Sequence, residues 1–357
     1  MDNRSKRIEG TSRLKARVFR EVLRAAGASD SNVARLNFGE IQSDIKSHRG
    51  VKYSNAQSFE SMHDRDHLPE IHAYTERYLF SVENVTLDTA TGILFSDAGK
   101  IIEESTSWPA SNILLNSIPK PPSKGVPHIG TDGRCTVSLP ANGFYHWLIE
   151  DLGPFIFAVQ NSEPSLALIY ERAGSYLDSV LPLIDAEFLR VPRFVHLDNY
   201  TFTSKGSDTG WPHQTDISTL RSFLAAYIRE REEGKRIYIS RLDSSRSPNF
   251  EKTLVSRLRE EGWEILNTER MSLADQVNTI SSASILCGVH GAGLAGMIWM
   301  APGSQVIELG PRRFVPCFSR LSHIHGSRHQ LISFEDPQQK SVDEIHLEIV
   351  KSLGSAE

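Results

Sequence analysis

One stretch of the sequence could bind a phosphate group. A short apolar run, Ile285–Val289, has the length and composition of a buried parallel strand. The turn that follows it consists of His290, Gly291, Ala292, Gly293 and Leu294. Glycines let the backbone approach a ligand closely, and the first N–H groups of the helix expected next carry a partial positive charge. The turn therefore favours an anion, whereas the glycines alone would equally well permit close packing of a strand on a helix.

Glu308 is expected at the same edge as this turn. Pro302-Gly303-Ser304 end the expected helix, and Gln305–Leu309 has the composition of the next buried strand. Strand, turn, helix and strand form one βαβ unit, and such sheets hold ligands at the carboxyl ends of their strands. Because His290 and Glu308 are polar and both stand at such an end, they favour a ligand site over packing alone.

Two arginines follow an earlier strand. The run Ile237–Ser240 ends at Arg241, and Arg246 stands in the loop after it. A guanidinium at the carboxyl end of a strand can hold a diphosphate through paired, charge-assisted hydrogen bonds. A solvated arginine is the alternative, and the glycine turn favours the phosphate role for Arg241.

A third stretch could bind and deprotonate a hydroxyl group. The residues at positions i, i+4, i+8 and i+9 of a helix that begins at Asn142 or Gly143 lie close to one face, and they are Asn142, His146, Glu150 and Asp151. A histidine beside a carboxylate can act as a general base. The inward-facing positions are Tyr145, Leu148, Ile149 and Leu152. The alternative is an asparagine cap with a solvated His–Glu pair.

Two segments rich in histidine have a spacing that could bind a metal ion, but a metal site is not the preferred interpretation of either. In His63-Asp64-Arg65-Asp66-His67 two acids stand between two histidines, but no strand is expected to hold them, and a solvated loop is the preferred interpretation. His323, His325 and His329 have a spacing that zinc accepts, but no cysteine or acid nearby completes the set. We therefore expect no metal.

The elements that must position these residues indicate an α/β protein. Four regions are predicted: 1–77, a basic amphipathic helix and an irregular extension; 78–225, an α/β domain with a β-meander; 226–330, a Rossmann-like domain; and 331–357, a helix packing back on the fold. In the second region, 164–170 and 193–197 are expected strands and 175–185 an expected helix, and a further helix is expected over 217–234.

Composition narrows the class of protein. A chain of 357 residues suits two domains, and its net charge of −5 gives no reason to expect nucleic-acid binding. The three cysteines, Cys135, Cys287 and Cys317, are few and far apart, which fits reduced thiols. No signal peptide and no apolar run of about 18 residues is present. We expect a cytoplasmic protein with at most peripheral membrane association.

Three stretches together resemble glycosyltransferase family 61: NGFYHWLIEDLGP, YISRLDSSRSPNFE and GVHGAGLAGMIWMAPGSQVIEL. This family includes bacterial capsule-type transferases, plant xylan-modifying enzymes and eukaryotic protein O-linked N-acetylglucosamine transferases. The resemblance runs from about Tyr78 to the C-terminal helix. It implies a GT-B-like fold, two Rossmann-like domains facing each other across a cleft, with the nucleotide-sugar in the C-terminal one. It also implies an inverting reaction that needs neither a metal nor a cofactor.

The resemblance assigns a role to each candidate residue. Arg241 and the turn from His290 to Leu294, with Arg246 nearby, would hold the diphosphate of the donor, and Glu308 would hold its ribose. Asn142, Tyr145 and Trp147 would stand on the acceptor side. His146 is the first choice for the base, with Glu150 or Asp151 as the second. The chain departs from the family at Gly296, where asparagine is common, and at Gly153-Pro154-Phe155, where an arginine is common.

The predicted function is transfer of a sugar from a nucleotide-sugar, by family expectation a UDP-sugar, to a hydroxyl of a glycan acceptor, in synthesis of a bacterial envelope or capsular polysaccharide. Three alternatives stay open: a nucleotide- or phosphate-binding protein that transfers nothing, a polysaccharide pyruvyl transferase, and an inactive scaffold of the same fold.

Overall fold

The computed structural model describes residues 33–34, 79–97, 99, 101–102, 105, 119–131, 135–140, 143–162, 166–203, 210, 212–244, 247–311, 316–334 and 341–354. Several sequence predictions therefore lie outside the described residues: the N-terminal amphipathic helix, the run His63–His67, and the side chains of Asn142 and Arg246.

The C-terminal half of the chain forms a five-stranded sheet, whose strand order is β11-β10-β12-β13-β14. Its strands are β10 (Arg236–Ile239), β11 (Glu264–Leu266), β12 (Ile285–Val289), β13 (Gln305–Pro311) and β14 (Arg328–Phe334). All neighbouring pairs are parallel, so their carboxyl ends share one edge. Apolar runs in the sequence predict the first four of these strands, β11 among them from the stretch WEILNTE. β14 was not predicted, and it crosses the predicted domain boundary at residue 330.

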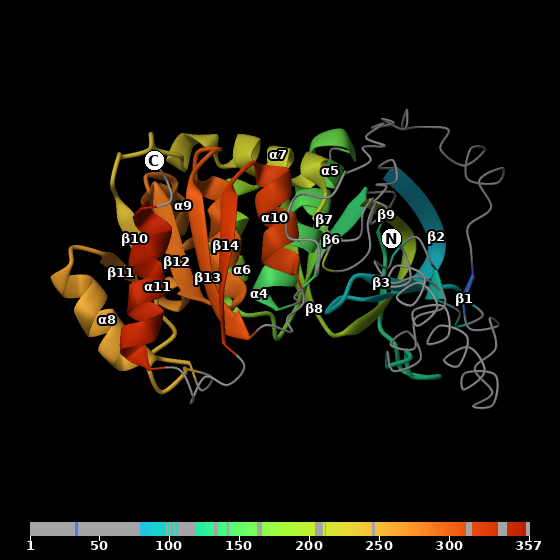
Figure 1. The fold of residues 1–357 in the computed structure, drawn as a ribbon. Coiled ribbons are helices and arrows are strands. Elements are labelled where there is room, and N and C mark those ends of the chain that lie inside the picture. The colour runs from blue at the N-terminus through green and yellow to red at the C-terminus, as the bar shows by residue number, and fades with distance from the viewer. Residues whose placement is uncertain are drawn as a thin grey trace, which may run out of the picture.

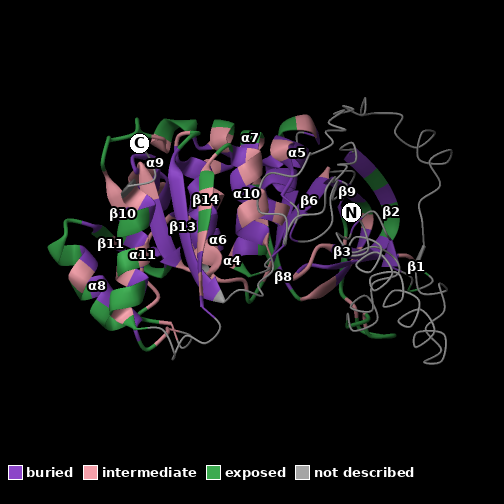
Figure 2. Ribbon diagram, viewed as in Figure 1, coloured by how far each residue is buried: buried purple, intermediate pink, exposed green. Residues whose placement is uncertain are grey.

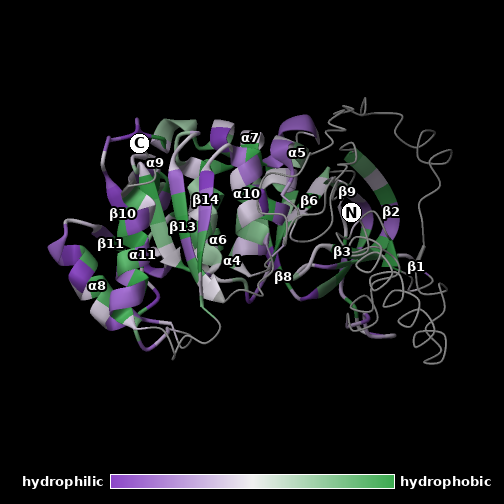
Figure 3. Ribbon diagram, in the orientation of Figure 1, coloured by the Kyte–Doolittle hydropathy of each residue, from purple (hydrophilic) through white to green (hydrophobic). Residues whose placement is uncertain are grey.

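Helices cover both faces of this sheet. On one face lie α8 (Glu251–Glu260) and α11 (Val342–Gly354), whose apolar residues cluster with Tyr238 and Ile307. On the other lie α9 (Leu273–Ser281), the 3₁₀-helix η7 (Ala292–Trp299) and α10 (Cys317–His325), which share a cluster with Ile237 and Val306. Successive residues of a strand point to opposite faces, so strands that are apolar throughout need cover on both sides. Figure 2 shows β12 and β13 largely buried and β14, at the edge of the sheet, partly exposed, and Figure 3 shows hydrophobic and hydrophilic residues alternating along α8 and α11.

A three-stranded parallel sheet precedes it, with strands β6 (Thr136–Leu139), β7 (Leu166–Tyr170) and β8 (Glu187–Val191). The helix between β6 and β7 has three parts: α4 (Phe144–His146), the π-helix η3 (Trp147–Leu152) and α5 (Gly153–Ser162). Between β7 and β8 the predicted helix is only a short α6 (Ser175–Asp178) and a 3₁₀ turn, η4 (Leu181–Leu183). Pro182 explains the break, because it has no N–H to donate and disfavours the helical conformation before it.

A mixed sheet of six strands forms the far end of the molecule, in the order β1-β4-β3-β2-β9-β5. The strands are β1 (Val33–Ala34), β2 (Leu79–Asp88), β3 (Ile93–Phe95), β4 (Ile101–Ile102), β5 (His128–Ile129) and β9 (Phe194–Thr203). The predicted β-meander is confirmed as the antiparallel run β2-β3-β4. Its longest pairing, β2 with β9, joins segments that are far apart in the sequence.

The chain then enters the C-terminal half through α7 (Gln214–Phe223) and the 3₁₀ turn η5 (Ala225–Tyr227). The helix predicted over 217–234 thus begins earlier and ends earlier. The charged segment RERE after Ile228 offers no apolar residue to bury, and helices in proteins depend on burying an apolar face.

One hydrophobic cluster runs through both parallel sheets. It contains Val137 and Ile169 of the three-stranded sheet, Ile237 and Val306 of the five-stranded sheet, and Trp299 of η7. Figure 1 shows the five-stranded sheet at one end, the sheet of β2 and β9 at the other, and α4, α5, α7 and α10 between them. The α/β class is confirmed, and the GT-B division into two facing domains stays a prediction.

Candidate active site

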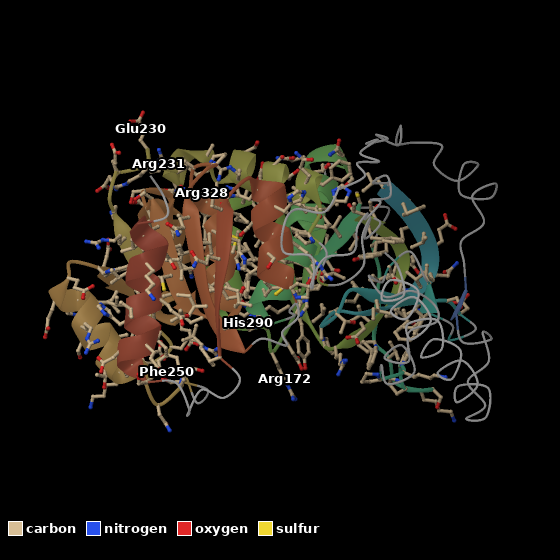
Figure 4. The ribbon with its side chains drawn as sticks, in the orientation of Figure 1. Arg172, Glu230, Arg231, Phe250, His290 and Arg328 are labelled. Atoms are coloured by element: carbon tan, nitrogen blue, oxygen red, sulfur yellow. The ribbon has the colours of Figure 1, made fainter. Side chains whose placement is uncertain are left out.

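Arg241, His290 and Glu308 stand at the carboxyl edge of the five-stranded sheet, as the sequence predicted. Arg241 follows β10, His290 follows β12, and Glu308 lies in β13 opposite Gly288. Figure 4 shows His290 at this edge, close to the position of α4, while Arg328, which begins β14, marks the opposite edge.

Arg241 is held at both its backbone and its side chain. Its backbone N–H donates to Glu251 Oε1 at 2.7 Å, and its Nη1 donates to the carbonyl of His290 at 2.5 Å. The guanidinium thus lies over the glycine turn. A methyl group built on Gly291 would lie 3.1 Å from Nη1 and 3.2 Å from Cζ of Arg241. Gly291 therefore makes room for the arginine.

Glu251, which the sequence argument had not assigned a role, supports Arg241. It is the first residue of α8 and is 0% exposed. Its carboxylate also accepts hydrogen bonds from Ser247 Oγ at 2.6 Å and from Tyr238 Oη at 3.3 Å. Burial, and then the charge of Glu251, hold the pKa of Tyr238 well above its ordinary range, so its hydroxyl keeps the proton that it donates. A buried carboxylate with three donors holds the loop after β10 in one conformation.

The other glycines of the turn serve close packing. A methyl group built on Gly293 would lie 2.7 Å from Ile239 Cγ2, and one on Gly296 would lie 2.7 Å from Ile280 Cδ1. The departure from the family at Gly296 therefore faces the core against α9. The Leu294 side chain is buried there too, and its N–H donates to the carbonyl of Gly291 at 3.0 Å. Close packing of the strand on the helix thus explains Gly293 and Gly296. Contact with the predicted phosphate-binding residue Arg241 explains Gly291.

Glu308 is buried between two imidazoles. Its Oε1 lies 2.5 Å from Nδ1 of His290 and its Oε2 lies 2.8 Å from Nε2 of His329. Burial by itself would raise the pKa of this carboxyl, but the hydrogen bonds and charges of the two histidines together hold the pKa below its ordinary value. The sequence placed Glu308 beside His290 correctly. The contact with His329 comes from β14, the strand that the sequence argument missed.

The predicted His–Glu pair is present on the helix after β6. His146 Nδ1 lies 3.0 Å from Glu150 Oε2, and the N–H of Gly210 donates to Glu150 Oε1 at 2.6 Å. The carbonyl of Gly210 in turn accepts from Arg320 Nη1 at 3.1 Å. His146 is half-exposed, whereas the side chain of Glu150 is 10% exposed. A carboxylate that orients one ring nitrogen prepares the other for proton transfer.

The two motifs meet through Phe318 of α10. Its ring is edge-on to His290, with centroids 5.1 Å apart, and edge-on to Tyr145, with centroids 5.5 Å apart. Tyr145 is in turn edge-on to its neighbour His146, at 5.4 Å. His290 and His146, which are predicted to stand on the donor side and the acceptor side, therefore belong to one aromatic cluster. No feature of the sequence pointed to Phe318 as the link.

Two predicted site residues lie elsewhere. Trp147 is 0% exposed and packs in the core against Tyr176, with ring centroids 4.8 Å apart, so it offers no surface to an acceptor. Asp151 is 3% exposed and lines a separate cavity of about 40 Å³ with Ser138 and Tyr200. Glu150 stands four residues after His146 and shares its face of the helix, whereas Asp151, the next residue, points to a different face.

The other departure from the family also lies in the core. A methyl group built on Gly153 would lie 2.6 Å from Cβ of Asp216, so α5 and α7 touch at this glycine. Pro154 and Phe155 are buried beside it. A larger side chain has no room at Gly153, and in the described part of the chain Glu150 is linked to the guanidinium of Arg320 through Gly210.

Two histidines of the HxHxxxH run, His325 and His329, make separate contacts. His325 contacts Ser327 Oγ at 2.6 Å and the carbonyl of Met300 at 3.0 Å, while His329 contacts Glu308. Burial, with the nearby charge of Arg221, lowers the pKa of His325 to about 4. Within the described residues no three His, Cys, Asp or Glu side chains are grouped so that they could hold a metal ion. In the same part of the chain, no helix is long and apolar enough to cross a membrane.

Comparison with known proteins assigns a family to part of the chain. The glycosyltransferase 61 family matches residues 144–307, which run from the start of α4 into β13 and cover most of the three stretches that carry the resemblance; Asn142 and Glu308 lie just outside the match. No curated protein matches the chain. The family resemblance seen in the sequence is confirmed over residues 144–307, and with it the enzyme class.

Proposed function

We propose that this glycosyltransferase, whose residues 144–307 match family 61, moves a sugar from a nucleoside diphosphate donor to a hydroxyl of a glycan, with inversion and without a metal ion. The main support for the proposal is that two groups suited to different parts of this reaction lie on either side of Phe318. A guanidinium lies over a glycine turn on one side, and a carboxylate-oriented histidine lies on the other.

Arg241 and the turn from His290 to Gly293 are the proposed diphosphate site. A guanidinium binds phosphate oxygens through a planar pair of N–H donors, and it cannot lose its charge. Arg241 is held by Glu251 and by the carbonyl of His290, so binding a ligand requires little reordering of the loop. The positive charge stabilises the departing diphosphate, the role that a divalent cation has in metal-dependent enzymes.

His146 is the proposed base. In the reaction the acceptor oxygen forms a bond to the anomeric carbon as the bond from that carbon to the diphosphate oxygen breaks, and the hydroxyl proton passes to His146. Glu150 accepts from Nδ1 of the same ring, which leaves Nε2 as the nitrogen that takes the proton. Buried Asp151 lines a different cavity, which favours His146 with Glu150 over Asp151.

The wider proposal follows the family resemblance. The two parallel sheets support a GT-B-like division, with the donor in the C-terminal half. The nucleotide is proposed to be uridine diphosphate and the acceptor an envelope or capsular glycan. The enzyme would then act in the cytoplasm, with at most peripheral membrane association.

A thermal-shift panel of nucleoside diphosphates and their sugars, with and without a chelator, tests this function. A ligand at 100 times its dissociation constant stabilises the folded state by about 2.7 kcal/mol. We expect stabilisation by one diphosphate, unchanged by the chelator, and transfer of the matching sugar. A shift without any turnover would favour an inactive scaffold, and no shift with any diphosphate would contradict the proposal.

A further inference from the structure

His329 belongs to a histidine run that the proposed function does not use. Its side chain is 9% exposed, and its Nε2 contacts Glu308, whose other oxygen contacts His290. Nδ1 of His329 lies 3.2 Å from the hydroxyl of Ser319 on α10. Each heteroatom of this ring thus has a partner on a different element.

Rigid strands set the geometry of this chain of contacts. In the sheet His329 pairs with Val306, and Glu308 lies two residues further along β13. Residues two apart in a strand point to the same face, so Glu308 shares the face of Val306, against which α10 packs. The carboxylate that contacts the ring of His290 is therefore held by neighbouring strands.

The hydrogen positions follow from the charge of Glu308. The hydrogen bonds from the two histidines outweigh burial and hold the pKa of Glu308 below its ordinary value, so the carboxyl is ionised near neutral pH and can only accept. His290 then carries its hydrogen on Nδ1, and His329 carries one on Nε2. Besides the two histidines, Glu308 faces Cys317 of α10, and burial and then the charge of Glu308 raise the pKa of that thiol to about 12, so the thiol stays neutral.

We propose that His329 is a positioning residue of the donor site: through Glu308 it fixes the ring orientation and the tautomer of His290, the residue that begins the glycine turn. With both carboxylate oxygens engaged, Glu308 cannot rotate without losing a hydrogen bond, and His290 cannot turn without losing Glu308. Glu308 thereby acts on the donor through His290. The ligand in this inference, a diphosphate, rests on the proposed function.

The test compares three variants. His329→Leu removes the N–H donor, and His329→Gln keeps an amide N–H near the position of Nε2. The matched control is His323→Leu, which removes another imidazole of the same run from a partly buried position on α10. Two quantities are measured: the ring nitrogen signals of His290, by NMR on histidine-labelled protein, and the affinity for uridine, guanosine and adenosine diphosphate, by calorimetry.

In the wild type we expect the His290 signals of a ring with its hydrogen on Nδ1. His329→Leu should change these signals and weaken diphosphate affinity about tenfold. A loss of this size is the lower end of the range found when a residue that orients an imidazole is removed. His329→Gln should restore both, and His323→Leu should change neither. Restoration by glutamine would exclude a role confined to packing.

Two outcomes separate this inference from the proposed function. Unchanged His290 signals in a folded His329→Leu protein would overturn the inference, whatever the ligand. If no diphosphate binds the wild type although the His290 signals change in His329→Leu and recover in His329→Gln, the positioning role stands and the proposed donor fails. If His329→Leu does not fold, wild-type His290 signals together with wild-type affinity in His329→Gln support the inference, and altered signals there overturn it.

Discussion

Replacing Arg241 with leucine should abolish most of the affinity for a nucleoside diphosphate while leaving the protein folded. The variant loses the guanidinium and keeps an apolar side chain. Each charge-assisted hydrogen bond to the ligand contributes about 1.5–3 kcal/mol. Since every 1.4 kcal/mol is a factor of ten, loss of one such contact should weaken binding about 10- to 150-fold.

The cost in stability should be moderate. The hydrogen bond from Arg241 Nη1 to the carbonyl of His290 is lost, which costs about 1.5–3 kcal/mol because the donor is charged. The contact from the Arg241 backbone N–H to Glu251 does not depend on the side chain and should remain. A loss of this size does not unfold a protein whose total stability is about 5–15 kcal/mol.

The same strand supplies the matched control. Arg236 stands at the other end of β10, where it donates to the carbonyl of Glu261 at 3.1 Å and lies over the ring of Trp263. Arg236→Leu removes the same charge from the edge away from the turn. Calorimetric titration with diphosphates and the rate of sugar transfer should separate the two variants. Equal affinities in Arg241→Leu and Arg236→Leu would refute the assignment of Arg241.

Three further predictions concern the turn, the base and pH. In Gly291→Ala the new methyl group would lie 3.1 Å from Nη1 of Arg241 and should displace the guanidinium. The backbone at Gly291 is extended, with a φ of 173°, and therefore accepts an alanine. We expect weaker diphosphate binding by calorimetry and an unchanged melting temperature. Glu150→Gln should lower the transfer rate by about 10²-fold with little change in donor affinity, since it removes the charge that orients His146. Finally, the pKa of His325 is about 4 in the folded protein against an ordinary 6.5, so the unfolded chain takes up the proton first as the pH falls. Stability should therefore decline between these two values, by about 3 kcal/mol in total, as measured by denaturant unfolding.

Each of these has its own control. A methyl group built on Gly143 meets nothing within 4 Å, so Gly143→Ala should leave diphosphate affinity unchanged, and equal losses in both glycine variants would contradict the steric argument. A transfer rate in Glu150→Gln equal to that of the wild type would remove the carboxylate from the proposed mechanism. His325→Gln should flatten the pH dependence of stability, and an unaltered slope in this variant would show that another group is responsible.

Local patterns in the sequence determined the strands and the edge at which the predicted donor-side residues lie. Continuous apolar runs such as Ile285–Val289 can be buried only within a sheet covered on both faces, and parallel strands bring their carboxyl ends together. That reasoning placed Arg241, His290 and Glu308 correctly. The four-residue spacing of His146 and Glu150 likewise determined their contact, because it depends only on helical geometry.

Tertiary structure alone decided what these residues touch. Phe318 links His290 to Tyr145 only because α10 packs between the two sheets, and His329 reaches Glu308 only because β14 pairs with β13. The same packing buries Trp147 and turns Asp151 toward a different cavity, although both stand within the motif. The spacing of residues along the sequence indicates which face of a helix or strand each of them occupies. Which element covers that face depends on contacts between distant segments, and those are made only when the chain folds.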